Sequence, residues 1–251
     1  MIELFKSDLL TNAGFTMHGY TKRRGGVSEG SFSSLNLSYD VGDDPECVSK
    51  NLARLKSTLN VDVPLARVKQ VHGNRVVDAF ELAASWTESP NVEADGIVSK
   101  DMDIVIAVQN ADCAPVLLAD PVTGTVAAIH AGWRGAARRV IRSGIQAMIE
   151  KGANKENILV AIGPCACGKC YEVGDDVAKH FPESADPIKG KPGKYLLDLG
   201  LAIEVSLLGA GLLGGNIDRI DACSIHTEEV FSVRRDGSKT GRFLGFILGR
   251  A

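Results

Sequence analysis

Apolar residues recur at helical spacing in three stretches of the chain. In residues 47–59 and 134–151, apolar side chains three or four positions apart predict two amphipathic helices, and Gly152 ends the second. Asp198 precedes a third such stripe, in residues 199–207, and is the type of residue that caps a helix N-terminus. Each of these helices is expected to turn one face toward a core.

Short apolar runs predict the strands. Residues 104–108 read IVIAV, a β-branched run typical of a buried strand. Residues 116–119, 125–129 and 159–162 are further strand predictions, with a turn at 120–124 between the first two. Because hairpin-like and crossover-like connections both occur, the pattern favours an α+β fold with mixed sheets.

The Pro- and Gly-rich residues 187–193 (PIKGKPG) are the best linker prediction in the chain. The stretch is short, so we interpret it as a hairpin or surface loop. We therefore expect one domain over residues 1–251.

Composition and charge narrow the classes of function. Apolar residues make up 45% of the 251 residues, which supports a sizeable core and excludes a wholly disordered chain. With 28 basic and 31 acidic residues the net charge is −3, so no bulk electrostatic attraction to nucleic acid is expected. No apolar run approaches about 18 residues and no signal peptide is recognised, so we expect no membrane span and a cytoplasmic protein. The sequence indicates no oligomeric state.

Imidazole and thiol side chains stand next to turns at three predicted strand ends. His72, Cys113 and His130 together would make a His₂Cys set. Three protein ligands with an open fourth position is the arrangement of catalytic zinc, and the same set also suits copper. The alternative is that each is an ordinary buried thiol or a hydrogen-bonded histidine.

Charged residues beside these three suggest supporting roles. Asp112 precedes Cys113, and Asp95 lies in an Ala-Asp-Gly turn; either carboxylate would orient an imidazole or carry a proton, or simply cap a turn. Arg134 opens the helix that follows His130, where an anion would bind favourably. Arg235 lies in an Arg-Arg-Asp-Gly run that offers bidentate donors to an anion, or forms a charged turn.

A second cluster of ligand types follows later in the chain. Cys167 and Cys170 have C-x-x-C spacing, and Cys223 and His226 have C-x-x-H spacing. Two such pairs predict a closed, structural Cys₃His zinc site. The alternative is a set of reduced thiols in a Gly-rich loop.

Taken together, these motifs resemble the YfiH, or laccase-domain, family over nearly the whole chain. The segments that carry the resemblance are HGYT at 18–21, RRGGVS at 23–28, SLNL at 34–37, KQVHG at 69–73, ADC at 111–113, HAGWRG at 130–135, YEVG at 171–174, RRDG at 234–237 and TGR at 240–242. The resemblance implies a single-domain layered sandwich of mixed sheets flanked by helices. It also implies one zinc ion on His72, Cys113 and His130. The cysteine-rich residues 165–170 and His226, where many members have a cysteine, depart from the family pattern.

The resemblance implies a purine nucleoside phosphorylase that converts adenosine, inosine, guanosine and methylthioadenosine to base plus ribose 1-phosphate. It implies adenosine deaminase activity as well. Arg23, Arg134 or Arg235 would then hold phosphate, and Asn36 and Gln70 would contact sugar or base. The older laccase label implies copper and phenol oxidation, but five histidines do not supply an imidazole-rich multicopper cluster.

Two other interpretations remain open at this point. In a cysteine hydrolase, Cys113 would be the nucleophile and His72 or His130 its base. The family's link to peptidoglycan precursors makes a muropeptide-type substrate part of this interpretation. In the second, the chain would hold zinc as a binding partner of another protein without turnover. Sensitivity to chelators separates a thiol hydrolase from a zinc enzyme.

Overall fold

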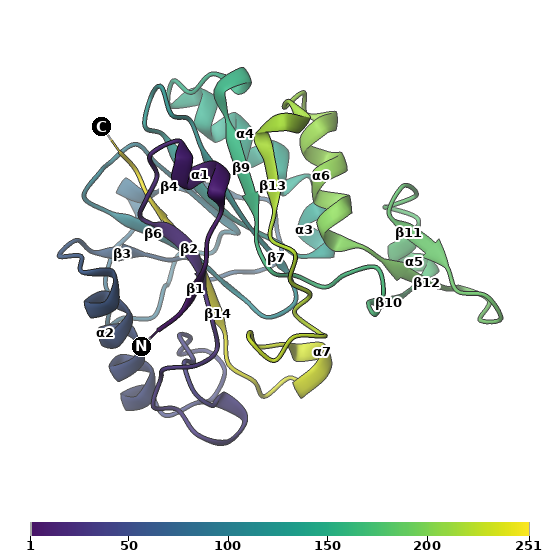
Figure 1. Cartoon of the computed structure of the whole chain (residues 1–251), viewed down its shortest axis with the longest axis horizontal. Helices are drawn as coiled ribbons and strands as arrows, with labels where there is room; N and C mark the ends of the chain where they lie inside the picture. The colour runs from purple at the N-terminus through teal and green to yellow at the C-terminus, as the bar shows by residue number, and fades with distance from the viewer. Residues whose placement is uncertain (1, 251) are drawn as a thin grey trace.

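Two β-sheets lie face to face in the computed structural model, which describes residues 2–250 (Figure 1). One is five-stranded, in the order β1-β2-β14-β6-β3, and the other is six-stranded, in the order β13-β9-β7-β8-β5-β4. Both sheets mix parallel with antiparallel pairs. The five-stranded sheet consists of β1 (Leu4–Phe5), β2 (His18–Thr21), β3 (Leu65–Ala66), β6 (Val105–Asn110) and β14 (Phe243–Leu248). The six-stranded sheet consists of β4 (Val76–Asp78), β5 (Gly96–Ser99), β7 (Ala114–Ala119), β8 (Val126–Ala131), β9 (Leu159–Ile162) and β13 (Ile217–Arg219).

The core between the sheets is filled by side chains from both. Tyr20 and Phe243 of the five-stranded sheet pack with Ile97 and Leu117 of the six-stranded sheet, and all four are fully buried. Strands β7 and β8 are buried at every position, because the sheet that contains them is covered on both faces. This double burial explains why these strands are continuous apolar runs without alternation.

The three longest of the seven α-helices in residues 2–250 cover the two outer faces of the sheet pair. The helices are α1 (Asp8–Asn12), α2 (Pro45–Leu59), α3 (Trp133–Ala137), α4 (Val140–Glu150), α5 (Asp175–Ala178), α6 (Leu199–Gly209) and α7 (Val233–Asp236). Helix α2 packs Leu52 and Leu55 on the five-stranded sheet, whereas α4 and α6 pack Ile145 and Ile203 on the six-stranded sheet. The result is an α-β-β-α sandwich, which confirms the predicted α+β fold with mixed sheets. No helix in residues 2–250 has the length and apolar character needed to cross a membrane.

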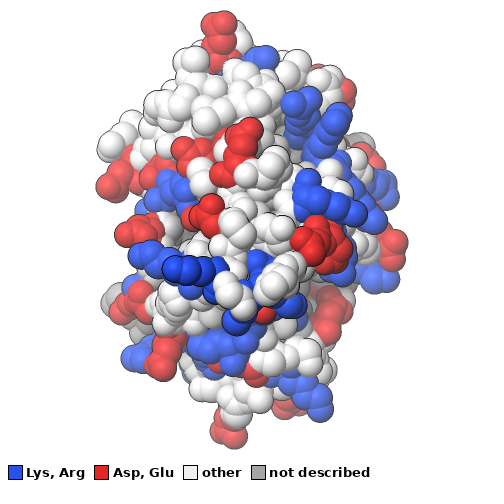
Figure 2. Space-filling model, turned by 90° about the vertical axis from the view of Figure 1, so that its right-hand side faces the viewer, with Lys and Arg blue, Asp and Glu red and all other residues white. Residues whose placement is uncertain are grey.

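A small third sheet projects from the sandwich beside α5 (Figure 1). It has the order β10-β12-β11 and consists of β10 (Glu172–Gly174), β11 (Ala185–Pro187) and β12 (Lys194–Leu197). Strands β11 and β12 are antiparallel, so residues 188–193 form the connection of a hairpin, as predicted for 187–193, and Pro187 is the last residue of β11. On the face from which this sheet projects, acidic and basic side chains are intermingled (Figure 2).

Apart from shifts of one or two residues at the ends of elements, the local predictions hold with one exception. Helix α2 begins earlier than expected because Asp44 caps it and Pro45 occupies its first turn, and Asp198 caps α6 as predicted. The predicted helix over 134–151 is instead two helices, α3 and α4, because Arg139 adopts the left-handed conformation (φ 66°). The break lets Arg138 contact the His72 loop through its guanidinium and its carbonyl oxygen. Tertiary contacts therefore override the helical pattern here.

Candidate functional site

His72, Cys113 and His130 meet at one end of the six-stranded sheet. His130 is near the end of β8, Cys113 directly precedes β7, and Pro115 of β7 pairs with His130. His72 comes from the loop between β3 and β4. One nitrogen or sulfur atom of each residue lies within 4.8 Å of the others. The fold thus gathers three predicted ligands from three separate segments.

The backbone around the three residues is specialised for close approach. His72 (φ 57°) and Asp112 (φ 89°) both adopt positive φ angles, which are costly for residues with a Cβ atom and often occur at functional sites. A Cβ atom at Gly132 would lie 2.7 Å from the Cys113 sulfur and 3.0 Å from Nδ1 of His72. Gly132 therefore leaves the space in which the two side chains approach each other.

Asp95 connects two of the three predicted ligands. Its buried carboxylate lies 2.9 Å from Nδ1 of His130 and accepts backbone N–H bonds from His72 (2.9 Å) and Gly73 (2.6 Å). Burial would raise the pKa of Asp95, but the hydrogen bonds from His130 and the backbone lower it. With Nδ1 engaged by a carboxylate, the Nε2 atom of His130 is left for a ligand. This is the arrangement in which a carboxylate orients a metal-binding histidine.

Electrostatics favour a thiolate at Cys113. Burial would raise the pKa of this thiol, but the charge of His130 and hydrogen bonds from both imidazoles lower it to about 6. Burial would lower the pKa of His130, whereas the charge of Cys113 and the bond to Asp95 raise it to about 9. One thiolate and two imidazoles fit zinc or copper by their chemistry, and three donors leave a fourth position open.

Asp112 connects the Cys113 turn to three residues that are distant in the sequence. Its carboxylate accepts hydrogen bonds from Oγ of Ser224 (2.7 Å) and from the backbone N–H of Arg234 (2.8 Å). Its backbone oxygen accepts from the N–H of Ala166 (2.9 Å). Because both carboxylate oxygens are engaged, these contacts favour a positioning role for Asp112 over proton transfer.

A cleft of about 620 Å³ opens beside the three predicted ligands. Its lining includes Gln70 and Arg134 from the predicted set. The amide of Gln70 exchanges hydrogen bonds with the backbone of Gln109 in both directions, each 2.7 Å long. The guanidinium of Arg134 lies 4.5 Å from the ring centre of Trp133. Gln70 thus shapes the wall, whereas Arg134 presents a cation to the cleft.

The other three predicted substrate contacts are not among the described residues that line this cleft. Arg23 pairs with Asp236 at 3.1 Å, and the buried Asn36 donates its amide N–H to the Ser38 carbonyl and to Asp43. The guanidinium of Arg235 donates to backbone carbonyls, including those of Ser224 and Val230, and to Asp236. Each of these side chains is engaged in holding the fold together.

Two arginines that the sequence reasoning did not single out line the cleft instead. The guanidinium of Arg234 lies 4.8 Å from the ring centre of Tyr171, and both residues line the cleft. Arg242 also lines it, and burial lowers the pKa of this guanidinium, opposed by the charges of Cys113 and Asp112. Both arginines belong to motifs quoted above, RRDG and TGR. Helix α7 determines that Arg234 rather than Arg235 lines the cleft, and the sequence pattern of the RRDG run did not predict this choice.

Outside this cleft, the structure also brings together the second predicted ligand set. One donor atom of each of Cys167, Cys170, Cys223 and His226 lies within 4.8 Å of the others. Among residues 2–250, two groups of side chains could hold a metal ion: these four, and the group of His72, Cys113 and His130.

Fold and site together define a mixed-sheet sandwich with a His₂Cys group at the edge of a cleft. The family described as "Multi-copper polyphenol oxidoreductase laccase" matches residues 17–250. The chain belongs to this family, which confirms the resemblance that its motifs indicated.

Relatives and solved structures match over nearly the whole chain. A protein from Deinococcus radiodurans named purine nucleoside phosphorylase is 39% identical, covering 92% of this chain and 88% of the relative. One of the same name from Streptomyces coelicolor is 36% identical, covering 91% and 93%. The crystal structure of YlmD from Geobacillus stearothermophilus superposes with a TM-score of 0.87 at 33% identity, covering 94% and 93%. The crystal structure of Neisseria meningitidis protein NMB0706 superposes with a TM-score of 0.84 at 31% identity. The match covers 100% of this chain and 99% of that protein.

Proposed function

We propose that this chain is a zinc-dependent purine nucleoside phosphorylase acting on adenosine, inosine, guanosine and methylthioadenosine, and that it also deaminates adenosine. The observation that carries the proposal is the His₂Cys group of His72, Cys113 and His130 beside a cleft lined by arginines. Relatives named purine nucleoside phosphorylase support an enzyme with a nucleoside and phosphate as substrates. A reducing compartment such as the cytoplasm would keep its cysteines as thiols.

Phosphate binding is assigned to the arginines of the cleft. Phosphorolysis passes through a transition state with positive charge on the ribose. A phosphate anion must therefore be held and aimed at the anomeric carbon, which carries the base. Arg134 and Arg234 each lie over an aromatic ring, which orients the guanidinium, and Arg242 lies in the same lining. Of the arginines predicted from the sequence, Arg134 is retained. Arg23 and Arg235 are replaced, because their guanidinium groups are engaged elsewhere.

His72, Cys113 and His130 are the residues that would hold the metal. Zinc bound there supplies a Lewis acid with one free coordination position. Asp95 holds His130 in the orientation that presents Nε2, and Gly132 keeps the space between the ligands clear. For deamination a carboxylate must carry a proton. We assign this role to Asp40, an exposed residue of the cleft lining, because both oxygens of Asp112 already accept hydrogen bonds.

Zinc is preferred over copper on the distribution of histidines. A copper oxidase that reduces oxygen needs several imidazole-rich copper sites. Of the five histidines, His18 is buried and bonded to the backbone of Ser7 and Phe15, and His180 belongs to neither ligand group. The remaining three are divided between two groups, so no multicopper site can be assembled from the described residues.

A turnover assay on the purified protein tests the proposal. With zinc present, wild type is expected to release hypoxanthine from inosine only when phosphate is added. Cys113→Ala should abolish this release, and the distant Cys47→Ala should leave it unchanged. Phosphate-independent release, or equal activity in wild type and Cys113→Ala, would refute the phosphorylase assignment. Asp40→Asn should lower the conversion of adenosine to inosine more than it lowers phosphorolysis.

One observation favours a second function, that of a cysteine hydrolase. Cys113, His130 and Asp95 lie in the order thiolate, imidazole and carboxylate that activates a cysteine nucleophile. A muropeptide-type peptidoglycan precursor would then be the substrate. Removal of metal with a chelator separates the two functions, because the hydrolase would keep its activity and the phosphorylase would lose it.

A further inference from the structure

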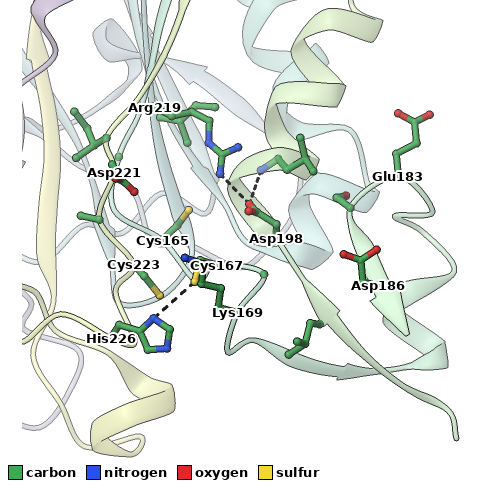
Figure 3. Close-up of a pocket in the computed structure, with 18 residues that line it drawn as sticks. Cys165, Cys167, Lys169, Glu183, Asp186, Asp198, Arg219, Asp221, Cys223 and His226 are labelled. Carbon is green, nitrogen blue, oxygen red and sulfur yellow. Dashed lines mark hydrogen bonds and ion pairs between the residues drawn. The ribbon is translucent and has the colours of Figure 1, made fainter. Parts of the chain in front are cut away.

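A second group of metal-ligand side chains lies next to the cleft but outside its lining. Cys167 and Cys170 come from the loop between β9 and β10, and Cys223 and His226 come from the loop between β13 and α7. Figure 3 shows three of the labelled side chains, Cys167, Cys223 and His226, gathered at one edge of the adjacent pocket. We propose that the four residues form a structural zinc centre. This inference does not depend on the proposed catalytic function.

The sulfur–sulfur distances suit one tetrahedral ion, and the imidazole of His226 lies slightly farther out. The Sγ atoms of Cys167 and Cys170 are 3.7 Å apart, and those of Cys170 and Cys223 are 3.5 Å apart. Nδ1 of His226 lies 4.0 Å from the Cys167 sulfur. A tetrahedron with Zn–S bonds of about 2.3 Å and a Zn–N bond of about 2.0 Å has ligand atoms roughly 3.5–3.8 Å apart. The sulfurs are much too far apart for a disulfide, whose atoms are about 2.05 Å apart.

Each loop closes into a turn that points both of its ligands the same way. The N–H of Cys170 donates to the carbonyl of Cys167 (3.2 Å), and the N–H of Thr227 donates to the carbonyl of Cys223 (3.0 Å). Ligands three residues apart across such turns are the usual halves of a structural zinc site. The loops are joined by a hydrogen bond from the N–H of Ser224 to the carbonyl of Cys165 (3.0 Å).

The donor count separates this centre from the first. Four protein donors complete a tetrahedron and leave no position for a substrate, whereas the first group has three. Cys165, the nearest further cysteine in the sequence, is buried in the core next to α6 and is outside the group. His226 is exposed, and the other three ligands are partly exposed, so an ion has access from solvent.

The proposed centre would support the neighbouring turn that precedes Cys113. The loops that it joins contain Ala166 and Ser224, which both donate hydrogen bonds to Asp112, the residue before Cys113. The metal would also close the loop between Cys170 and Cys223, which are 53 residues apart and flank the three-stranded sheet and α6. Closing a long loop and ordering its ends are the ways in which a structural metal stabilises a fold.

Metal counting on the full-length protein tests the inference. After desalting, wild type is expected to contain about two zinc ions per chain, because each ligand group holds one. Cys113→Ala and the double variant Cys170→Ser, Cys223→Ser should each contain about one, and the control Cys47→Ser about two. The measurement does not use turnover, so failure of the phosphorylase proposal would leave it intact. Wild-type zinc content in the double variant would overturn the inference.

Two variants at an exposed position test the centre even if the double variant fails to fold. His226 is exposed, so His226→Ala should keep the wild-type circular dichroism spectrum and lose its second zinc at a lower chelator concentration. His226→Cys keeps four donors and should retain the ion as wild type does. Cobalt added to metal-free Cys113→Ala should give the visible spectrum of a tetrahedral thiolate complex. Equal chelator sensitivity of His226→Ala and wild type, or no such cobalt spectrum, would refute the centre.

Discussion

The residues around Cys113 depend on one another more closely than their positions in the chain indicate. Asp95 contacts both the His130 ring and the backbone of His72, so one carboxylate sets the orientation of two predicted ligands. Asp112 does the same for the Cys113 turn through Ser224 and Arg234. Changes at these supporting residues should therefore alter metal binding at the proposed site without removing a ligand.

Replacement of Asp95 by Asn tests this dependence. Asp95→Asn keeps the size of the side chain but removes the charge that orients His130, so zinc affinity at the first site should fall by roughly 10- to 100-fold. Competition with a chelator measures the affinity, and the exposed Asp103→Asn serves as the control. Unchanged affinity in Asp95→Asn would show that the carboxylate does not orient the histidine.

Gly132 allows a test by steric exclusion. Its φ of −78° is ordinary, so Gly132→Ala adds no backbone strain, but its methyl group would collide with the Cys113 sulfur. We expect this variant to fold and to lose the zinc of the first site. Gly209→Ala is the matched control, because a Cβ there meets open space. It should keep its zinc content, and its Tm should not fall, because Ala favours a helix over Gly. Normal zinc binding by Gly132→Ala would contradict the described packing.

The pKa of Cys113 predicts a pH profile for the metal-free protein. Only the thiolate reacts with iodoacetamide, and the thiolate fraction grows as the pH rises through the pKa. Since the pKa of Cys113 is lowered to about 6, its alkylation rate should reach half its maximum near that pH. Peptide mass spectrometry follows each cysteine. Partial desolvation and nearby carboxylates raise the pKa of Cys47, so this residue should react only at much higher pH. A midpoint near that of Cys47 would exclude the thiolate–imidazolium pair.

At the scale of elements, α2 both covers a sheet and holds the loop that precedes it. The buried amide of Asn51 accepts from the N–H of Val27 (2.8 Å) and donates to Oγ of Ser28 (2.9 Å) and to the carbonyl of Asn36 (2.9 Å). One helix side chain thus organises a long irregular segment whose own sequence has little regular pattern.

Removal of this amide should therefore be costly. Asn51→Ala leaves several buried polar groups without partners, so the free energy of unfolding should fall by about 2–4 kcal/mol. Ser57→Ala, at an exposed position of the same helix, should change it by less than about 0.5 kcal/mol. Urea denaturation measures both. Similar values for the two variants would mean that the Asn51 network contributes little.

At the scale of the whole molecule, the two ligand groups lie where chain segments from different parts of the sequence cross. The first joins the loop after β3 to the ends of β7 and β8, and the second joins the loops after β9 and β13. Metal bound at these crossings would stabilise the folded state more than the unfolded chain, because the complete ligand sets are dispersed in the unfolded chain.

Metal removal should therefore lower the thermal stability of the whole protein. Saturation of a site at a thousand times its Kd contributes about 4 kcal/mol, which corresponds to a rise in Tm of roughly 8–16 °C for a chain of this size. Calorimetry on zinc-loaded and chelator-stripped protein should show this difference, and added zinc should restore it. Identical Tm values for the two samples would argue against tight metal binding at either site.

The sequence by itself determined most of the local secondary structure and which residue types are present as candidate metal ligands. Apolar spacing predicted α2, α6, and strands β6 to β9, because helix and strand periods depend only on which face is buried. The Asp198 cap and the C-x-x-C and C-x-x-H pairs were also predicted, since turns and caps are formed by residues close in the chain.

Only the tertiary structure decided which of these groups meet. His72, Cys113 and His130 lie in separate segments, and their approach depends on the order and register of the strands, which no local pattern encodes. The same reason explains why Arg235 is engaged by backbone carbonyls while Arg234 and Arg242 line the cleft. It also explains the break between α3 and α4, where contacts of Arg138 with the His72 loop outweigh a continuous helical pattern. Local periodicity determines which face of a helix or strand is buried. The packing of elements that are distant in the sequence determines which residues that face contacts.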